Sequence, residues 1–470
     1  MDRLGDFVTG RKQVYEEGRI RLSPAIVVPM SFLFVILVGT LLLMMPFSSA
    51  SGESTDLVTA LFTATTATCV TGLVVVDTYA YWSLAGQIII LILIQLGGLG
   101  IISFTSMVLL ITHKKFSLQD RKLLIDAMNL DLGHGLLSFL VKVFKWTFIV
   151  EGFGALLFSF EFIPRYGVVN GIWYSVFTSI SAFCNAGIDV LGPDSLIGFN
   201  TDPGVLCITM FLIIMGGLGY VVWFDVSGDI KDGIRNGYTP LQTVKRFGVH
   251  TRLVLCLTFA LIALGALIVF PAEFYNPGTI GDMCLRDKIV NSIFQSVTFR
   301  TAGFASVPQQ ELSPVSVLIG YFLMFIGGSP IGTAGGVKTV TMFIVFMNVI
   351  VFMRGQKEAV VFKTRITEEL MRKSAAIVTV SMTVVLIGTM LILLTNPVNM
   401  EDSLFEVISA VATVGLSRAV TPTLNTLGRI VIIVTMYLGR IGPISLVLFF
   451  AGKKSGNGRI EYAEGKFYVG

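Results

Sequence analysis

The chain has 470 residues, of which 54% are hydrophobic and 14% charged, and its mean hydropathy is +0.80. A soluble globular protein cannot bury so large an apolar fraction, so the composition excludes that class and predicts an integral membrane protein. The formal net charge of +4 says little by itself, and no nucleic-acid partner is expected.

Apolar segments long enough to cross a hydrocarbon layer of ~30 Å as helices of ~20 residues recur along the whole chain. No cleavable signal peptide precedes them, because the first twenty residues are charged. The expected spans come in pairs, and the second member of the third pair is long and interrupted. The pairs are 25–46 with 84–112, 136–163 with 204–228, 248–271 with 314–352, and 372–396 with 427–451.

The short segment between the two spans of each pair ends in a glycine followed by one large apolar residue. The four segments read "ALFTATTATCVTGL", "SVFTSISAFCNAGI", "SIFQSVTFRTAGF" and "VISAVATVGL". Their glycines, Gly72, Gly187, Gly303 and Gly415, are separated by 115, 116 and 112 residues. Four copies at one period predict a unit that is repeated four times.

We therefore expect an all-α membrane protein with four covalently linked span–pore loop–span repeats. These would supply eight transmembrane helices and four re-entrant pore helices around a pseudo-fourfold central pore. The predicted segments are a cytoplasmic N-terminal segment (1–22), pore repeats 1 (23–113), 2 (135–228), 3 with a broken second span (248–354) and 4 (370–452), and a cytoplasmic C-terminal tail (453–470).

The short segments cannot themselves cross the membrane. Residues 56–68 would span only ~20 Å as a helix. The chain must turn back through an extended piece, which is tolerated only where the backbone is buried or lines a watery cavity. Four such turns could form a ring of carbonyl oxygens that replaces the hydration shell of a monovalent cation. The candidate carbonyls belong to Val70, Thr71, Gly72, Asn185, Ala186, Gly187, Thr301, Ala302, Gly303, Thr413, Val414 and Gly415.

At these positions the chain resembles the ion-conducting subunit of Ktr-type potassium transporters, within the Trk/Ktr/HKT superfamily. The resemblance covers about residues 23 to 452, and its signatures read "CVTGL", "CNAGI", "RTAGF" and "TVGL". It implies potassium uptake through a filter with one glycine per loop, with K⁺ held by backbone carbonyls. The longer Thr-Val-Gly-Tyr-Gly of potassium channels is absent, which implies looser discrimination between K⁺ and Na⁺. Whether sodium is cotransported stays open.

The resemblance also implies a bacterial inner-membrane location, a homodimer, and a cytoplasmic ring of nucleotide-binding RCK-type regulatory subunits. Apart from the transported ion, no cofactor is expected. Lys and Arg collect in alternate connecting segments, which predicts that these segments and both termini are cytoplasmic. The basic segments are 3–21, 114–122, 231–252, 354–373 and 453–466.

The second span of the third pair, 314–352, contains the stretch "FIGGSPIGTAGGVKT" from Phe325 to Thr339. Its proline and glycines disfavour a continuous helix, so it is a candidate moving part, with a packing kink as the alternative. The resemblance implies a loop that obstructs the ion path below the filter. The candidate gate residues are Gly327, Gly328, Ser329, Pro330, Gly332, Thr333, Gly335, Gly336 and Lys338. A nucleotide-binding loop is rejected, because Val337 stands where the motif needs glycine.

Arg440 is the second candidate gate element. It occupies the position where the other three second spans carry Gly98, Gly217 and Gly328. A charge near the middle of a span is unfavourable and marks a functional site by default. The alternative is an arginine that satisfies carbonyls of the broken third span. The resemblance implies an electrostatic barrier to cations.

Other function classes fit the sequence less well. A secondary transporter of another small substrate, with broken helices at the midplane, would typically show inverted or twofold repeats. A water or ammonium channel lacks the paired Asn-Pro-Ala motif and histidines in the loops, and no nucleophile–base constellation indicates an enzyme. Four further charges within spans are expected to be paired structural charges or interface residues, with partners that the sequence does not identify: Lys142, Lys145, Glu151 and Asp225.

Overall fold

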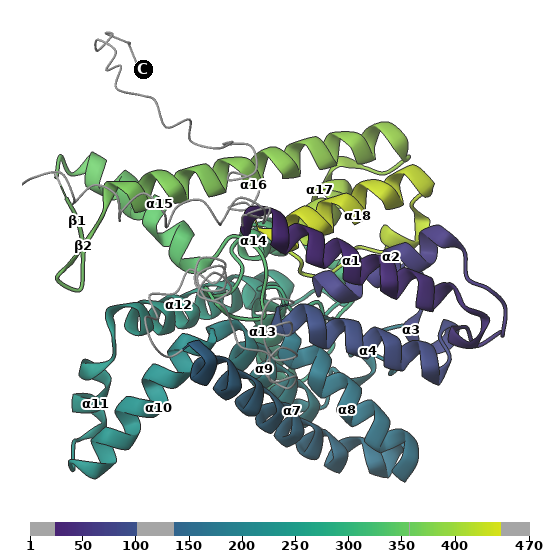
Figure 1. The fold of residues 1–470 in the computed structure, drawn as a ribbon, viewed down its shortest axis with the longest axis horizontal. Coiled ribbons are helices and arrows are strands. Elements are labelled where there is room, and N and C mark those ends of the chain that lie inside the picture. The colour runs from purple at the N-terminus through teal and green to yellow at the C-terminus, as the bar shows by residue number, and fades with distance from the viewer. Residues whose placement is uncertain (1–23, 101–135, 357, 443–470) are drawn as a thin grey trace, which may run out of the picture.

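The computed structural model describes residues 24–100, 136–356 and 358–442, and its regular structure is almost entirely helical (Figure 1). The predicted N-terminal segment 1–22 and C-terminal tail 453–470 lie outside these residues. The helices are α1 (Pro24–Met44), α2 (Leu57–Cys69), α3 (Thr78–Tyr81), α4 (Leu84–Leu99), α7 (Leu136–Tyr166), α8 (Val168–Cys184), α9 (Pro203–Leu218), α10 (Tyr220–Arg235), α11 (Pro240–Arg246), α12 (Val249–Glu273), α13 (Leu285–Thr298), α14 (Pro314–Phe325), α15 (Thr339–Met353), α16 (Glu368–Thr395), α17 (Met400–Val411) and α18 (Thr426–Ile441).

The main helices form four sets in chain order, each with a first helix, a short helix and a second helix. The sets are α1–α2–α4, α7–α8–α9, α12–α13–α14 and α16–α17–α18. Within each set the short helix packs on the first helix, and the second helix of each set packs on the short helix of the next: α4 on α8, α9 on α13, α14 on α17 and α18 on α2 (Figure 1). The order of contacts is therefore cyclic.

Two of the four short helices, α2 and α17, begin with a side-chain acceptor for their free N–H groups. The Asp56 carboxylate accepts from the N–H groups of Val58 and Thr59 at the start of α2, and Asn399 caps α17. At the other end, α2 and α8 stop at residues in the left-handed conformation, Val70 and Asn185. The predicted glycine turns therefore follow directly from helix C-termini.

Three of the described helices are long and apolar enough to cross a membrane: Ser138–Tyr166, Val249–Glu273 and Glu368–Thr395. The number is four if α9 and α10 count as one bent span, against the eight spans predicted. One reason is that α4 and α18 reach Gly100 and Gly442, beyond which the expected spans 84–112 and 427–451 run outside the described residues. Another is that the span 314–352 is interrupted by the loop 326–338.

The prediction of one continuous span over 204–228 was wrong. The chain bends by 97° between α9 and α10, at Gly219 with φ +88°. A β-carbon on Gly219 would lie 2.5 Å from the Pro330 carbonyl oxygen, and the Tyr220 N–H donates to the Ile331 carbonyl at 3.0 Å. The bend therefore packs against a segment that lies more than a hundred residues later in the chain.

A two-stranded hairpin amends the expectation of an all-α protein. Strands β1 (Ala359–Val361) and β2 (Thr364–Ile366) pair antiparallel, with Val360 opposite Arg365. The turn between them uses positive φ at Phe362 and Lys363. In Figure 1 the hairpin and α10–α11 project from the helical body.

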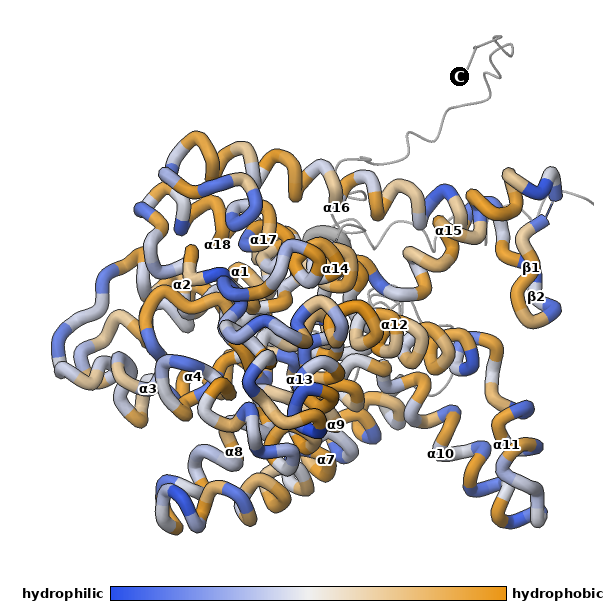
Figure 2. Tube along the Cα trace, turned by 180° about the vertical axis from the view of Figure 1, so that it is seen from behind, coloured by the Kyte–Doolittle hydropathy of each residue, from blue (hydrophilic) through white to orange (hydrophobic). Residues whose placement is uncertain are grey.

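Apolar side chains cover much of the outer surface. Phe160 is 71% exposed on α7, and Phe259 and Leu267 are 75% and 73% exposed on α12. Figure 2 shows long hydrophobic stretches along these helices and along α16. Exposed apolar area of this extent is unfavourable in water and is expected of a surface that faces lipid.

Candidate cation site and its closing loop

The four predicted turn glycines lie side by side. A β-carbon added to any of them would meet the backbone of another turn at or below 2.7 Å, so no side chain fits. In each case the added atom would approach the carbonyl oxygen of the residue that precedes the next glycine: Gly72 meets Ala186, Gly187 meets Ala302, Gly303 meets Val414 and Gly415 meets Thr71. The structure therefore brings together all four turns, in cyclic order.

The four turns share one backbone conformation. Two residues before each glycine, φ is +55° at Val70, +58° at Asn185, +65° at Thr301 and +51° at Thr413. Three of these residues are β-branched, and such a residue in the left-handed region is strained by about 1–3 kcal/mol. Strain of this kind persists only where the surrounding structure enforces it, and it is concentrated at functional sites.

Buried hydroxyl groups without partners accompany the turns. The Oγ1 atoms of Thr71, Thr301 and Thr413 are buried and have no hydrogen-bond partner among the described residues. A buried polar group normally has a partner, so these three oxygens have hydrogen-bonding capacity left for water or an ion. They lie on three of the four predicted carbonyl segments.

Residues 326–338 form a loop that closes on itself and on the end of α9. Ile326 and Val337 form a parallel bridge, and the Gly327 N–H donates to the Val337 carbonyl at 2.9 Å. The carbonyls of Gly216 and Gly217 accept from the N–H groups of Thr333 and Ser329, at 3.1 and 2.9 Å. The loop contains all of the gate candidates except Arg440: Gly327, Gly328, Ser329, Pro330, Gly332, Thr333, Gly335, Gly336 and Lys338.

The same loop touches two of the four turns. Thr333 Oγ1 donates to the Phe183 carbonyl at 3.0 Å, and the Asn185 side-chain amide lies 3.3 Å from Thr333 Oγ1. On the other side, a β-carbon on Gly335 would overlap Thr413 Oγ1. The loop is therefore packed directly against the second and fourth turns.

Arg440 lies in the last turn of α18, one residue before the helix ends. Its guanidinium donates to the Thr333 carbonyl at 2.7 Å and to the Gly97 carbonyl, so it joins the loop to the end of α4. The Lys338 Nζ donates to the Ala334 carbonyl at 2.6 Å. Two cationic side chains are thus bound to the loop backbone, and Arg440 does satisfy a carbonyl of the interrupted span.

A comparison with protein families identifies this arrangement. The model of the TrkH family, described as "Cation transport protein", matches residues 20–458. The chain belongs to the TrkH family. It is therefore a multi-pass membrane transport protein and not an enzyme.

Individual members of the TrkH family confirm the resemblance to Ktr-type proteins. The chain is 38% identical over 451 residues to Ktr system potassium uptake protein B of Bacillus subtilis, across 96% of this chain and 98% of the relative. It is 36% identical over 433 residues to potassium/sodium uptake protein NtpJ of Enterococcus hirae, across 91% and 93%. The crystal structure of the potassium transporter TrkH from Vibrio parahaemolyticus shares the fold, with a TM-score of 0.72 at 15% identity over 93% of this chain and 86% of that one.

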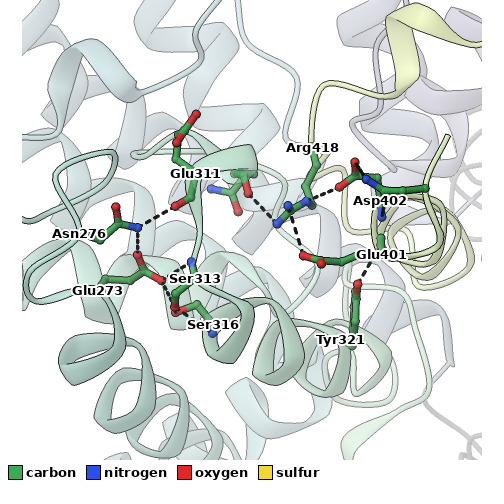
Figure 3. A network of polar contacts seen from close by, with 11 residues as sticks. Glu273, Asn276, Glu311, Ser313, Ser316, Tyr321, Glu401, Asp402 and Arg418 are labelled. Atoms are coloured by element: carbon green, nitrogen blue, oxygen red, sulfur yellow. Dashed lines mark hydrogen bonds and ion pairs between the residues drawn. The ribbon is translucent and has the colours of Figure 1, made fainter.

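This TrkH-family chain also has a polar network beyond the turns that sequence analysis did not single out (Figure 3). Arg418, three residues after Gly415, pairs with Asp402 at 2.6 Å and Glu401 at 3.3 Å. Its guanidinium also lies 3.4 Å from the Gln309 carbonyl, in the segment that follows the third turn. The Arg418 side chain is only 12% exposed. Arg418 therefore links the segments that follow the third and fourth turns.

We expect Arg418→Gln to lower the unfolding temperature of the detergent-purified protein by about 3 °C or more, because it breaks the partly buried ion pair between Arg418 and Asp402. Arg429→Gln is the matched control, since the guanidinium of Arg429 donates to the carbonyls of Leu424 and Pro422 in its own segment. Thermal unfolding followed by tryptophan fluorescence measures both variants. Equal shifts of the unfolding temperature in the two variants would contradict a stabilising link by Arg418 between the segments that follow the third and fourth turns.

The charges within the predicted spans have different environments. The Glu151 carboxylate is buried and accepts from Gln95 Nε2 at 3.0 and 3.1 Å. Asp225 accepts from the Gly248 N–H at 3.1 Å, at the start of α12. Lys142 and Lys145 are exposed on α7. Glu151 and Asp225 thus hold neighbouring helices together, and no ion pair is needed to explain either.

Proposed function

We propose that the chain is the ion-conducting subunit of a Ktr-type potassium uptake system in the bacterial inner membrane. Its four helix sets act as span–pore loop–span repeats that supply eight transmembrane helices around a pseudo-fourfold pore, with both termini cytoplasmic. The observation that carries the proposal is the ring in which each turn glycine faces the carbonyl before the next glycine. Two relatives, named as a potassium uptake protein and a potassium/sodium uptake protein, support it.

The carbonyls of residues 70–72, 185–187, 301–303 and 413–415 bind K⁺ as the transported ion in this proposal. Oxygen atoms from backbone carbonyls can replace a hydration shell, and hydroxyls without partners lie beside them. One glycine per turn gives a short filter, so discrimination against Na⁺ rests on few carbonyl layers. Sodium dependence belongs to the same proposal, and the name of the Enterococcus hirae relative supports it.

The loop 325–339 and Arg440 form the gate in this proposal. The loop contacts the second and fourth turns, and the Arg440 guanidinium is fixed to it at the Thr333 carbonyl. A positive charge beside a cation path raises the electrostatic barrier to cations. Movement of the loop away from the turns would displace the charge and open the path.

The assembly that we propose is a homodimer on a cytoplasmic ring of RCK-type nucleotide-binding subunits, surrounded by lipid. The basic segment 231–247 covers the end of α10 and all of α11. These two helices project from the helical body together with the β1–β2 hairpin, which lies in the basic segment 354–373 (Figure 1). These elements are therefore the docking surface that we expect for the ring. The dimer contact that we propose is the end of the C-terminal tail, residues 461–470, which lies outside the described residues.

Expression in a bacterial strain without its own potassium uptake systems tests the proposal. We expect growth on low-potassium medium with this chain, and Rb⁺ uptake by liposomes that contain the purified protein, competed by K⁺. An empty vector and protein-free liposomes are the controls. Liposomes that take up neither Rb⁺ nor K⁺ but do accumulate an organic or anionic solute would contradict the proposal.

A further inference from the structure

In three of the four turns, a backbone N–H donates a hydrogen bond to a side-chain hydroxyl of the preceding short helix. The Gly72 N–H donates to Thr66 Oγ1 at 3.0 Å, and the Gly415 N–H donates to Ser409 Oγ at 3.0 Å. In the second turn, the Ile188 N–H donates to Ser181 Oγ at 3.1 Å. Each hydroxyl stands six residues before its glycine, and all three side chains are fully buried.

The third turn is built differently. Val297 occupies the equivalent position, and the hydroxyl comes one residue later, from Thr298, which donates to the Phe304 carbonyl at 2.6 Å. The backbone shifts in the same way: the Ala302 N–H bonds to the carbonyl of Thr298, whereas Thr71 bonds to that of Thr66, five residues back. The third turn thus exchanges a hydroxyl acceptor for a hydroxyl donor.

These bonds act on strained backbone. The Gly72 and Gly415 N–H groups each lie two residues after a β-branched residue with positive φ, Val70 and Thr413. A buried N–H that loses its acceptor is unfavourable to a degree comparable with the strain itself. Removal of the hydroxyl would therefore let the turn relax and move its carbonyls.

We propose that Thr66, Ser181 and Ser409, together with Thr298, are positioning residues that fix the spacing of the carbonyl ring and so set its discrimination between K⁺ and Na⁺. The inference rests on the proposed function of the turns. It adds residues that do not touch the ion and act only through the bonds to the turns.

Thr66→Val tests the inference, because it removes the hydroxyl and keeps the side-chain volume. We expect the ratio of K⁺ to Na⁺ uptake in proteoliposomes to fall about fivefold or more, which corresponds to about 1 kcal/mol. Thr66→Ser should restore the wild-type ratio. Thr63→Val is the matched control, since Thr63 lies on the same helix and donates only to the Thr59 carbonyl of that helix, at 2.9 Å. It should leave the ratio unchanged.

Ser409→Ala provides the second variant if Thr66→Val does not yield folded protein. A K⁺ to Na⁺ ratio that stays at the wild-type value in folded Thr66→Val or Ser409→Ala would overturn the inference. An equal fall in Thr63→Val would also overturn it, because a general loss of helix packing would then be the cause. In either case K⁺ uptake by the wild type would leave the proposed function intact. Absence of K⁺ uptake by the wild type would refute the proposed function itself.

Discussion

Gly72→Ser and Gly303→Ser should each abolish potassium-dependent growth rescue or lower the ratio of K⁺ to Na⁺ uptake about tenfold or more. Two physical causes act together. The backbone at these glycines has φ of +96° and +81°, which disfavours any side chain. An added β-carbon would also overlap the Ala186 carbonyl oxygen at Gly72 and lie 2.6 Å from the Val414 carbonyl oxygen at Gly303. The neighbouring carbonyls must therefore move.

A matched control separates the ring from glycine conformation in general. Gly52 also has positive φ, at +73°, but an added β-carbon there would meet nothing within 4 Å. Gly52→Ser should therefore leave growth and ion uptake at wild-type values. If the two ring variants transported K⁺ and Na⁺ as the wild type does, with equal protein in the membrane, the filter assignment would be wrong.

The turn positions could be predicted because glycine is required there for two reasons, and both constrain the residue type. Positive φ and the approach of another turn leave no alternative at Gly72 or Gly415. Because the four turn glycines recur at a nearly constant spacing, they could be distinguished from the other glycines of the chain. The interruption of the span 314–352 could also be predicted from sequence, since Pro330 and its neighbouring glycines disfavour a helix.

The bend at Gly219 could not be predicted, because the segment that packs against it is distant in the chain. In sequence, "GGLG" at 216–219 reads like the helix-packing cluster "GGLG" at 97–100. At the bend, Gly219 and Tyr220 pack against Pro330 and Ile331. The two clusters read alike in sequence, so the sequence does not reveal these contacts.

The hydroxyl side chains that bond to the turns, and Arg418, were not predicted, for a different reason. Thr66 lies in α2 with four other threonines, and nothing local distinguishes it from Thr63. Alignment of the four copies on their glycines would have shown a hydroxyl at the same offset in three of them. Arg418 had no such signal, because its partner Gln309 belongs to another helix set more than a hundred residues away.

Arg440→Ala should raise cation flux through proteoliposomes on the order of tenfold, with reduced discrimination between K⁺ and Na⁺. The guanidinium joins the loop 326–338 to α4 through the carbonyls of Thr333 and Gly97. Its removal deletes a positive charge beside the proposed path, where low dielectric strengthens each charge interaction. It also frees the loop from α18. Rb⁺ flux at matched protein density measures the change.

Arg440→Lys separates the two roles of this side chain. Lysine keeps the positive charge but has a compact ammonium in place of the planar fork that reaches both carbonyls. If the charge forms the barrier, Arg440→Lys should conduct as slowly as the wild type. If the bridge between the loop and α4 holds the gate shut, Arg440→Lys should conduct as fast as Arg440→Ala. Wild-type flux in a well-expressed Arg440→Ala variant would exclude both roles, and the loop would then have to obstruct the path without help from α18.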